Sequence, residues 1–153
     1  MEKIALVIDS TAYLSEEEIN RYAITVVPLT VNFPDGFIYD GIVDAKDFFA
    51  RVEKSAKLPF TSQPAVGAFV ETYKALIAEG KEIVSIHISS RLSGTFESAR
   101  GAASMVDPNK ITVIDSTVTS APMAYLVLAA ARWAEEGHSR AEIGARLEQD
   151  KKE

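Results

Sequence analysis

The stretch Ile83-Val84-Ser85-Ile86-His87-Ile88 leads directly into Ser89-Ser90-Arg91-Leu92-Ser93-Gly94-Thr95. The first six residues are mostly apolar and β-branched, which is typical of a buried strand. The next seven are rich in hydroxyls and contain a glycine, which is typical of a turn into a helix. Backbone N–H groups are free at a helix start, and the helix dipole adds partial positive charge there. The sequence therefore predicts a strand-to-helix turn suited to a carboxylate or a phosphate.

Two other turns repeat this arrangement. Asp9-Ser10-Thr11 follows the apolar run 4–8, and Asp115-Ser116-Thr117 follows the run 111–114. In an open parallel sheet the carboxyl ends of the strands share one edge, and ligands bind outside it. We expect the three turns to meet there and Ser10 and Ser116 to contribute to the site. The alternative role for both aspartates is helix capping, and Asp9 is also a candidate phosphoryl-transfer nucleophile or magnesium ligand.

Strand and helix patterns alternate along the whole chain. Helices are expected near 15–22, 44–56, 64–79, 94–105 and 119–136, with a last helix from Ser139; strands are expected over 4–8, 24–32, 83–88 and 111–114, and a loop over 57–63. The pairs Ser15 with Glu18 and Ser139 with Glu142 form capping boxes. This alternation predicts a three-layer α/β sandwich with a mostly parallel sheet and helices on both faces.

Two features mark the central part of the chain. Asp44 is expected to cap the second helix, with Val43 and Phe48 packing together across its start. Further on, Thr61-Ser62-Gln63-Pro64 places hydroxyls just before a helix that Pro64 can start. That segment predicts a second helix start facing an anion, although Ser62 or Gln63 can equally be a simple cap.

The composition narrows the function. The 153 residues have the length of one domain, and 47% hydrophobic with 25% charged residues is typical of a globular protein. A net charge of −6 with scattered lysines and arginines argues against nucleic acid as a partner. No cysteine is present, so disulfides and thiolate chemistry are excluded, and neither histidine shows metal-ligand spacing. We expect no cofactor and no metal.

The chain starts with Met1-Glu2-Lys3 and continues directly into an apolar strand, so no signal peptide is expected. No apolar run approaches the ~20 residues of a membrane span. We therefore expect a cytoplasmic protein that does not span a membrane.

Four motifs, in this order and spacing, resemble the DegV family: Ile8-Asp9-Ser10-Thr11, Thr61-Ser62-Gln63-Pro64, the stretch 89–95 with Ser98-Ala99, and Val113-Ile114-Asp115-Ser116. The resemblance implies a bacterial fatty-acid-binding protein that is not itself an enzyme and that presents the bound carboxylate to a fatty acid kinase. Carried over by motif, Thr61 and Ser93 bind the carboxylate, and Ser62, Gly94 and Thr95 shape the pocket.

The sequence departs from the family in two respects. Residues 1–153 resemble only the N-terminal α/β domain, and the C-terminal domain that helps to enclose the lipid is absent. Lipid binding would then need a partner subunit or would be lost, and a homo-oligomer is one arrangement that supplies a partner. The segment 120–124 also stands where the family has small, glycine-rich residues.

Two further hypotheses remain open. One is an enzyme, such as an isomerase, or a sensor for a phosphorylated small molecule such as a sugar phosphate, because a serine-rich turn at a helix start also suits phosphate. The other is an interaction fragment without a ligand, because exposed apolar surface often marks an interface.

Overall fold

The computed structural model describes residues 3–41 and 44–152. The expectations that involve Met1, Glu2 and Val43 lie outside these residues. The main sheet has the order β2-β1-β6-β7, and all three pairs of neighbours are parallel. Its strands are β1 (Ile4–Asp9), β2 (Thr25–Val27), β6 (Glu82–His87) and β7 (Ile111–Asp115). β2 lies at the sheet edge and is followed by Pro28, as expected for a proline that cannot donate to a ladder.

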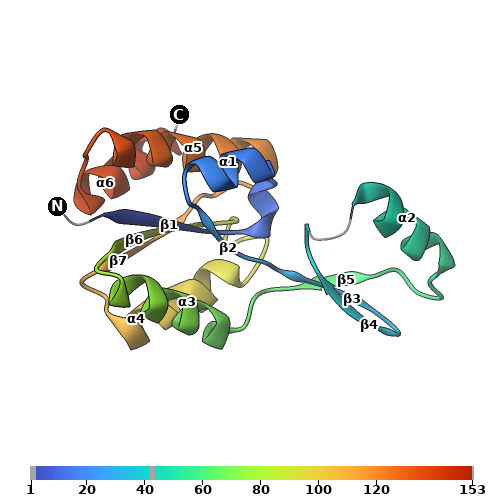
Figure 1. Cartoon of the computed structure of the whole chain (residues 1–153). Helices are drawn as coiled ribbons and strands as arrows, with labels where there is room; N and C mark the ends of the chain where they lie inside the picture. Colours follow the sequence, from blue (N-terminus) through green and yellow to red (C-terminus); the bar gives the residue numbers. More distant parts are fainter. Residues whose placement is uncertain (1–2, 42–43, 153) are drawn as a thin grey trace.

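Helices cover both faces of this sheet (Figure 1). On one face lie α1 (Glu16–Arg21), α5 (Ser120–Glu135) and α6 (Arg140–Asp150); on the other lie α3 (Val66–Ala78) and α4 (Thr95–Val106). Each face has its own buried apolar cluster, one centred on α5 and α6 and the other on α3 and α4. The predicted three-layer α/β sandwich is confirmed. Among the described residues, no helix combines the length and the apolar character that crossing a bilayer requires.

A second, antiparallel sheet projects from the main sheet with the order β4-β3-β5 (Figure 1). It consists of β3 (Thr30–Phe33), β4 (Gly36–Tyr39) and β5 (Phe60–Ser62). The helix α2 (Ala45–Lys54) packs on it through Phe48, whose ring meets the ring of Phe33 edge-on with centroids 6.2 Å apart.

This second sheet corrects two expectations. The single strand predicted over 24–32 is two strands in different sheets, because the chain leaves the main sheet at Pro28. The loop predicted over 57–63 contains β5, which is too short and too exposed to show an alternating apolar pattern.

Most helix boundaries follow the predicted local signals. Both capping boxes are present, and the carboxylate of Asp44 accepts a hydrogen bond from the N–H of Asp47. Gly80 follows the end of α3, and its φ of +81° lies in the left-handed region that favours glycine. Pro64 does not open its helix, because α3 begins at Val66 with Ala65 as the N-cap.

Candidate functional site

The three hydroxyl-rich turns meet at one edge of the main sheet. The carboxylate of Asp9 accepts a hydrogen bond of 2.9 Å from the N–H of Ile88. The carboxylate of Asp115 accepts bonds from the N–H and the hydroxyl of Ser90, at 3.2 and 2.5 Å. The N–H of Ser89 donates to the carbonyl of Val118 at 2.9 Å. The two aspartates thus cross-link the turns, as the neighbouring order β1-β6-β7 predicts.

A cavity of about 770 Å³ lies at this edge, between the turns and the second sheet. Four of the predicted site residues line it together: Thr61, Ser62, Ser93 and Gly94. Thr61 and Ser62 come from β5, and Ser93 and Gly94 come from the turn that precedes α4. Residues more than thirty positions apart in the sequence therefore share one hollow, which is the arrangement expected for the predicted anion site.

The second sheet positions the hydroxyls of β5. Thr61 pairs with Val31 and Ser62 with Thr30 on β3. The amide of Asn32 donates to the hydroxyl oxygen of Ser62 at 2.8 Å, so the Ser62 proton is free to point elsewhere.

One residue further on, Gln63 connects β5 to α4. Its amide nitrogen donates to the hydroxyl of Ser98 at 3.2 Å. This bond joins the two walls of the cavity.

Gly94 is required by a close approach of Gln63. A Cβ at position 94 would overlap the carboxamide of Gln63. We expect Gly94→Ala to displace that flexible carboxamide, break its bond to Ser98 and cost about 1 kcal/mol of folding stability. Urea unfolding measures that cost, and Gly101→Ala, on the open surface of α4, is the matched control. An unchanged Gln63–Ser98 contact in a crystal structure of Gly94→Ala would contradict this prediction.

Thr95 shapes the cavity from behind and does not line it. Its side chain is fully buried, and its hydroxyl lies 2.8 Å from the hydroxyl of Ser93. The N–H of Thr95 also donates to Ser93 Oγ, at 3.2 Å. Ser93 is thereby held at the start of α4, with its side chain fixed between the helix and the cavity.

Ser10 lies next to the cavity but does not line it. Its hydroxyl accepts from the N–H of Leu29 at 3.1 Å and donates to Asp40 Oδ2 at 2.9 Å. The hydroxyl of Tyr13 donates to the same oxygen at 3.1 Å. Burial raises the pKa of Tyr13 to about 12, and the negative charge of Asp40 adds to the effect. Asp40 and Leu29 both line the cavity, so Ser10 contacts two of its lining residues without lining it.

Ser116 lies apart from the other predicted site residues. It is fully buried, and its hydroxyl donates to the carbonyl of Val118 at 3.0 Å. It lines a different hollow, of about 370 Å³, next to α5 and α6. Asp115, one residue earlier, bonds to Ser90 of the neighbouring turn, but Ser116 itself lines only this other hollow among those described.

The segment that follows Ser116 contains strained backbone. Thr117 and Ser120 adopt the left-handed region, at φ +65° and +54°. Ser120 also lines the cavity.

The cavity is rich in hydroxyls and poor in positive charge. Among its lining residues, all within the described part of the chain, Asp40 alone carries a full charge. Its apolar lining includes Tyr13, Phe60 and Leu92, each more than 60% exposed. The hollow therefore combines neutral hydrogen-bond donors with open apolar walls.

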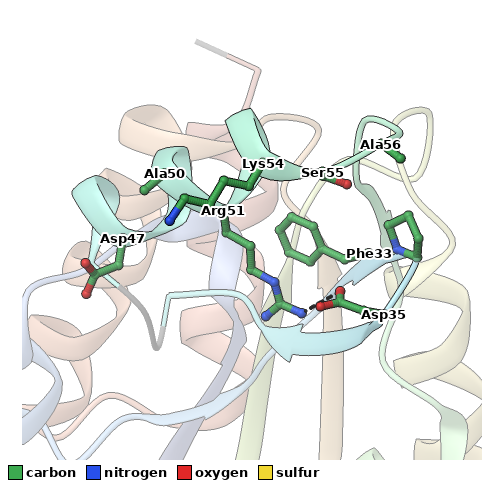
Figure 2. A pocket seen from close by; sticks show the side chains of 9 residues that line it. Phe33, Asp35, Asp47, Ala50, Arg51, Lys54, Ser55 and Ala56 are labelled. Carbon is green, nitrogen blue, oxygen red and sulfur yellow. Dashed lines mark hydrogen bonds and ion pairs between the residues drawn. The ribbon is translucent and has the colours of Figure 1, made fainter.

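A second cavity, of about 520 Å³, lies between the β3–β4 hairpin and α2 (Figure 2). The guanidinium of Arg51 lies over the ring of Phe33, 4.2 Å from its centroid, and pairs with the carboxylate of Asp35 at 3.0 Å. The positive charge of Arg51 is thus already paired with Asp35, whereas Lys54 is a second cation in the lining of this cavity.

Sequence reasoning missed the partners of both histidines. His87 is fully buried on β6, 3.1 Å from Asp9 and 2.6 Å from the hydroxyl of Ser85. No spacing signal could have paired it with Asp9, which is 78 positions away. His138 lies near the surface, 3.4 Å from Glu136 and 3.2 Å from Glu142.

Three comparisons place the chain among known proteins. Residues 3–153 match the family described as uncharacterised protein, DegV family. A DegV domain-containing protein of Halalkalibacterium halodurans is 42% identical over 99% of this chain and 54% of its own length.

Two solved structures are similar over 99% of the chain. One is a DegV family protein from Thermus thermophilus described by its fatty acid binding, with a TM-score of 0.91 and 35% identity over 54% of its length. The other is DegV, a fatty acid binding protein from Bacillus subtilis, with a TM-score of 0.91 and 37% identity over 55% of its length. The chain spans about half the length of the relatives it matches.

Proposed function

Because the chain belongs to the DegV family, we propose that it binds a long-chain fatty acid in the 770 Å³ cavity, with the carboxylate at Thr61 and Ser93. The observation that carries the proposal is the convergence of β5 and the 93–95 turn on one hollow. Ser62 and Gly94 line the same hollow, and Thr95 holds Ser93 in place. Ser10 contributes through Asp40, and Ser116 through the backbone of its turn.

The open apolar walls support an acyl ligand. Burial of each methylene contributes about 0.8 kcal/mol, whereas a hydrogen bond to a charged group contributes about 1.5–3 kcal/mol. The tail therefore sets most of the affinity, and the hydroxyls set the orientation of the head group. Because Tyr13, Phe60 and Leu92 are largely exposed, a partner subunit or a second copy of the chain would complete the cover over the tail.

We infer a non-catalytic role in the cytoplasm, with any phosphoryl transfer performed by a partner kinase. Ser85, His87 and Asp9 have the connectivity of a catalytic triad, but all three side chains are fully buried and no substrate can reach them. The hydroxyl cavity is open, so its bound carboxylate would stay within reach of a second protein.

Thr61→Ala combined with Ser93→Ala is expected to weaken fatty acid binding by about 100-fold, because two hydrogen bonds to a carboxylate are lost. Titration calorimetry with a long-chain fatty acid measures the change. The control is Thr72→Ala with Ser104→Ala, which removes two hydroxyls from α3 and α4 away from the cavity. Unaltered affinity in a folded Thr61/Ser93 double variant would show that the head group binds elsewhere.

The ligand class itself is tested by native mass spectrometry of the purified protein, followed by organic extraction and lipid analysis. We expect a near-stoichiometric fatty acid. If the folded protein carries none and takes up none from added fatty acid, this half alone does not bind lipid. A sugar phosphate is the poorer ligand, because the cavity places its dianion beside Asp40 with no cation among the lining residues that the structure describes.

A further inference from the structure

A buried chain of hydrogen bonds runs behind the cavity, from α3 to the end of β1. The hydroxyl of Tyr73 donates to Ser85 Oγ at 2.7 Å. Ser85 Oγ lies 2.6 Å from Nε2 of His87, and Nδ1 of His87 lies 3.1 Å from Oδ2 of Asp9. Each of these four residues has no exposed surface. The function proposed above uses none of their side chains.

The protons of this chain can be counted. The single hydroxyl proton of Tyr73 is donated to Ser85, so the Ser85 proton is free for Nε2 of His87. Nε2 is then an acceptor, and the ring proton lies on Nδ1, facing the carboxylate of Asp9. If Nε2 instead donated to Ser85 Oγ, that oxygen would accept from both Tyr73 and His87, and the buried Ser85 proton would lose its acceptor. In a neutral ring, this direction would also turn the Nδ1 lone pair toward the Asp9 carboxylate. This row of hydrogen bonds therefore favours a neutral His87 ring with its proton on Nδ1.

Asp9 is the end point of this chain and the link to the cavity. Its Oδ2 accepts from the N–H of Ile88 at 2.9 Å, in addition to His87. Its Oδ1 accepts from the N–H and the hydroxyl of Thr11, at 2.9 and 2.6 Å. Thr11 and Ile88 both line the 770 Å³ cavity and come from different turns. One carboxylate therefore holds two walls of the cavity together.

The groups in contact with the Asp9 carboxylate favour its ionised form. Burial raises the pKa of Asp9, but the hydrogen bond and the electrostatic attraction from His87, with the hydrogen bonds from Thr11 and Ile88, outweigh burial and lower the pKa below its usual value. Asp115 on β7 is the register partner of His87 on its other side, and its carboxylate is turned toward Ser90 and Thr117. On α3, Tyr73 donates to Ser85 as a neutral phenol, since burial raises the pKa of Tyr73. The ring of Phe69 covers His87 edge-on, with centroids 5.0 Å apart.

We propose that His87 and Asp9 are positioning residues for the head-group cavity. Neutral His87 orients the ionised carboxylate of Asp9, and Asp9 fixes the cavity walls at Thr11 and Ile88. The ligand-binding part of this inference rests on the proposed function, whereas the tautomer and the wall contacts do not.

The first test is nitrogen NMR of the histidine rings in the wild-type protein. The chain has two histidines, so a His138→Gln variant assigns the signals. We expect the His87 ring to show the neutral pattern with its proton on Nδ1 at neutral pH. A proton on Nε2, or an imidazolium in the neutral range, would overturn the inference. This measurement requires no substitution among the four buried, hydrogen-bonded residues.

The second test compares His87→Asn with His87→Leu. The asparagine amide keeps an N–H donor near the position of Nδ1, whereas leucine fills similar space without a donor. We expect fatty acid affinity within about threefold of wild type for asparagine and a loss of about tenfold or more for leucine, the size of one charged hydrogen bond.

The pH dependence of fatty acid affinity shows whether His87 acts by positioning Asp9 or only by packing. Without the ring donor, the pKa of Asp9 rises, and a protonated Asp9 holds the two walls less well. The ratio of wild-type to His87→Leu affinity is therefore expected to grow as the pH falls from about 8 to about 5. A ratio that is independent of pH, with equal losses in both variants, would show that His87 acts only by packing.

Amide hydrogen exchange at Thr11 and Ile88 gives a readout without ligand. We expect faster exchange of both amides in His87→Leu and near wild-type exchange in His87→Asn. If wild type binds no fatty acid but the exchange follows this pattern, the proposed ligand is wrong and the positioning role stands. If fatty acid binds but the exchange at both positions is unaffected by His87→Leu, the positioning role is wrong.

Discussion

Asp9→Asn is expected to lower the free energy of unfolding by about 3 kcal/mol or more at neutral pH. Both oxygens of Asp9 are acceptors, Oδ1 for Thr11 and Oδ2 for Ile88 and His87. Asparagine replaces one oxygen with an NH₂ group, which in either orientation meets N–H donors that face it. Because Asp9 is fully buried, water cannot satisfy the groups left unpaired.

The loss of unfolding free energy in Asp9→Asn should become smaller as the pH falls. The pKa of Asp9 is lowered in the folded protein, against burial, chiefly by the hydrogen bond from His87. A lowered folded-state pKa stabilises the fold above the unfolded-state value of about 3.9, and this stabilisation is lost as the pH falls through the folded-state value. The stability difference between wild type and Asp9→Asn should therefore narrow in strong acid.

Urea unfolding across the acid range measures both effects. The matched control is Asp47→Asn, an exposed carboxylate in the first turn of α2, for which we expect a change below about 0.5 kcal/mol. A wild-type and Asp9→Asn pair that unfolds at the same urea concentration at neutral pH would show that the hydrogen bonds to Asp9 contribute nothing net to folding.

Leu147→Ala is expected to destabilise the protein by about 2–5 kcal/mol, because it opens a cavity in a close-packed core. Leu147 lies on α6, near the end of the chain, and has no exposed surface. It belongs to the apolar cluster between the main sheet and α5, together with Leu6 and Ile114. This last helix is therefore part of the core of the domain, although α5 separates it in sequence from the last strand.

Thermal and urea unfolding check this result. Leu58→Ala is the matched control, since Leu58 is 83% exposed and its truncation should change stability by less than about 0.5 kcal/mol. If both leucines give the same small change, α6 does not contribute to the cooperative core.

The structure also shows which local signals could be interpreted from the sequence and which could not. The capping boxes at Ser15 and Ser139 were predictable, because a cap involves residues three positions apart. The second sheet was not, because β5 has only three residues and its partner β3 lies about thirty positions earlier. Strand pairing at that separation leaves no periodic signal in either segment.

The sequence by itself determined the alternation of strands and helices, the three hydroxyl-rich turns and the sheet edge at which they meet. These depend on the apolar period and on short-range hydrogen bonds, which are local properties. Only the tertiary structure decided that Thr61 on β5 and Ser93 line one cavity, that Ser116 lines another, and that His87 contacts Asp9. Side-chain direction and cross-strand register depend on how distant segments pack, so no single stretch of the chain encodes them.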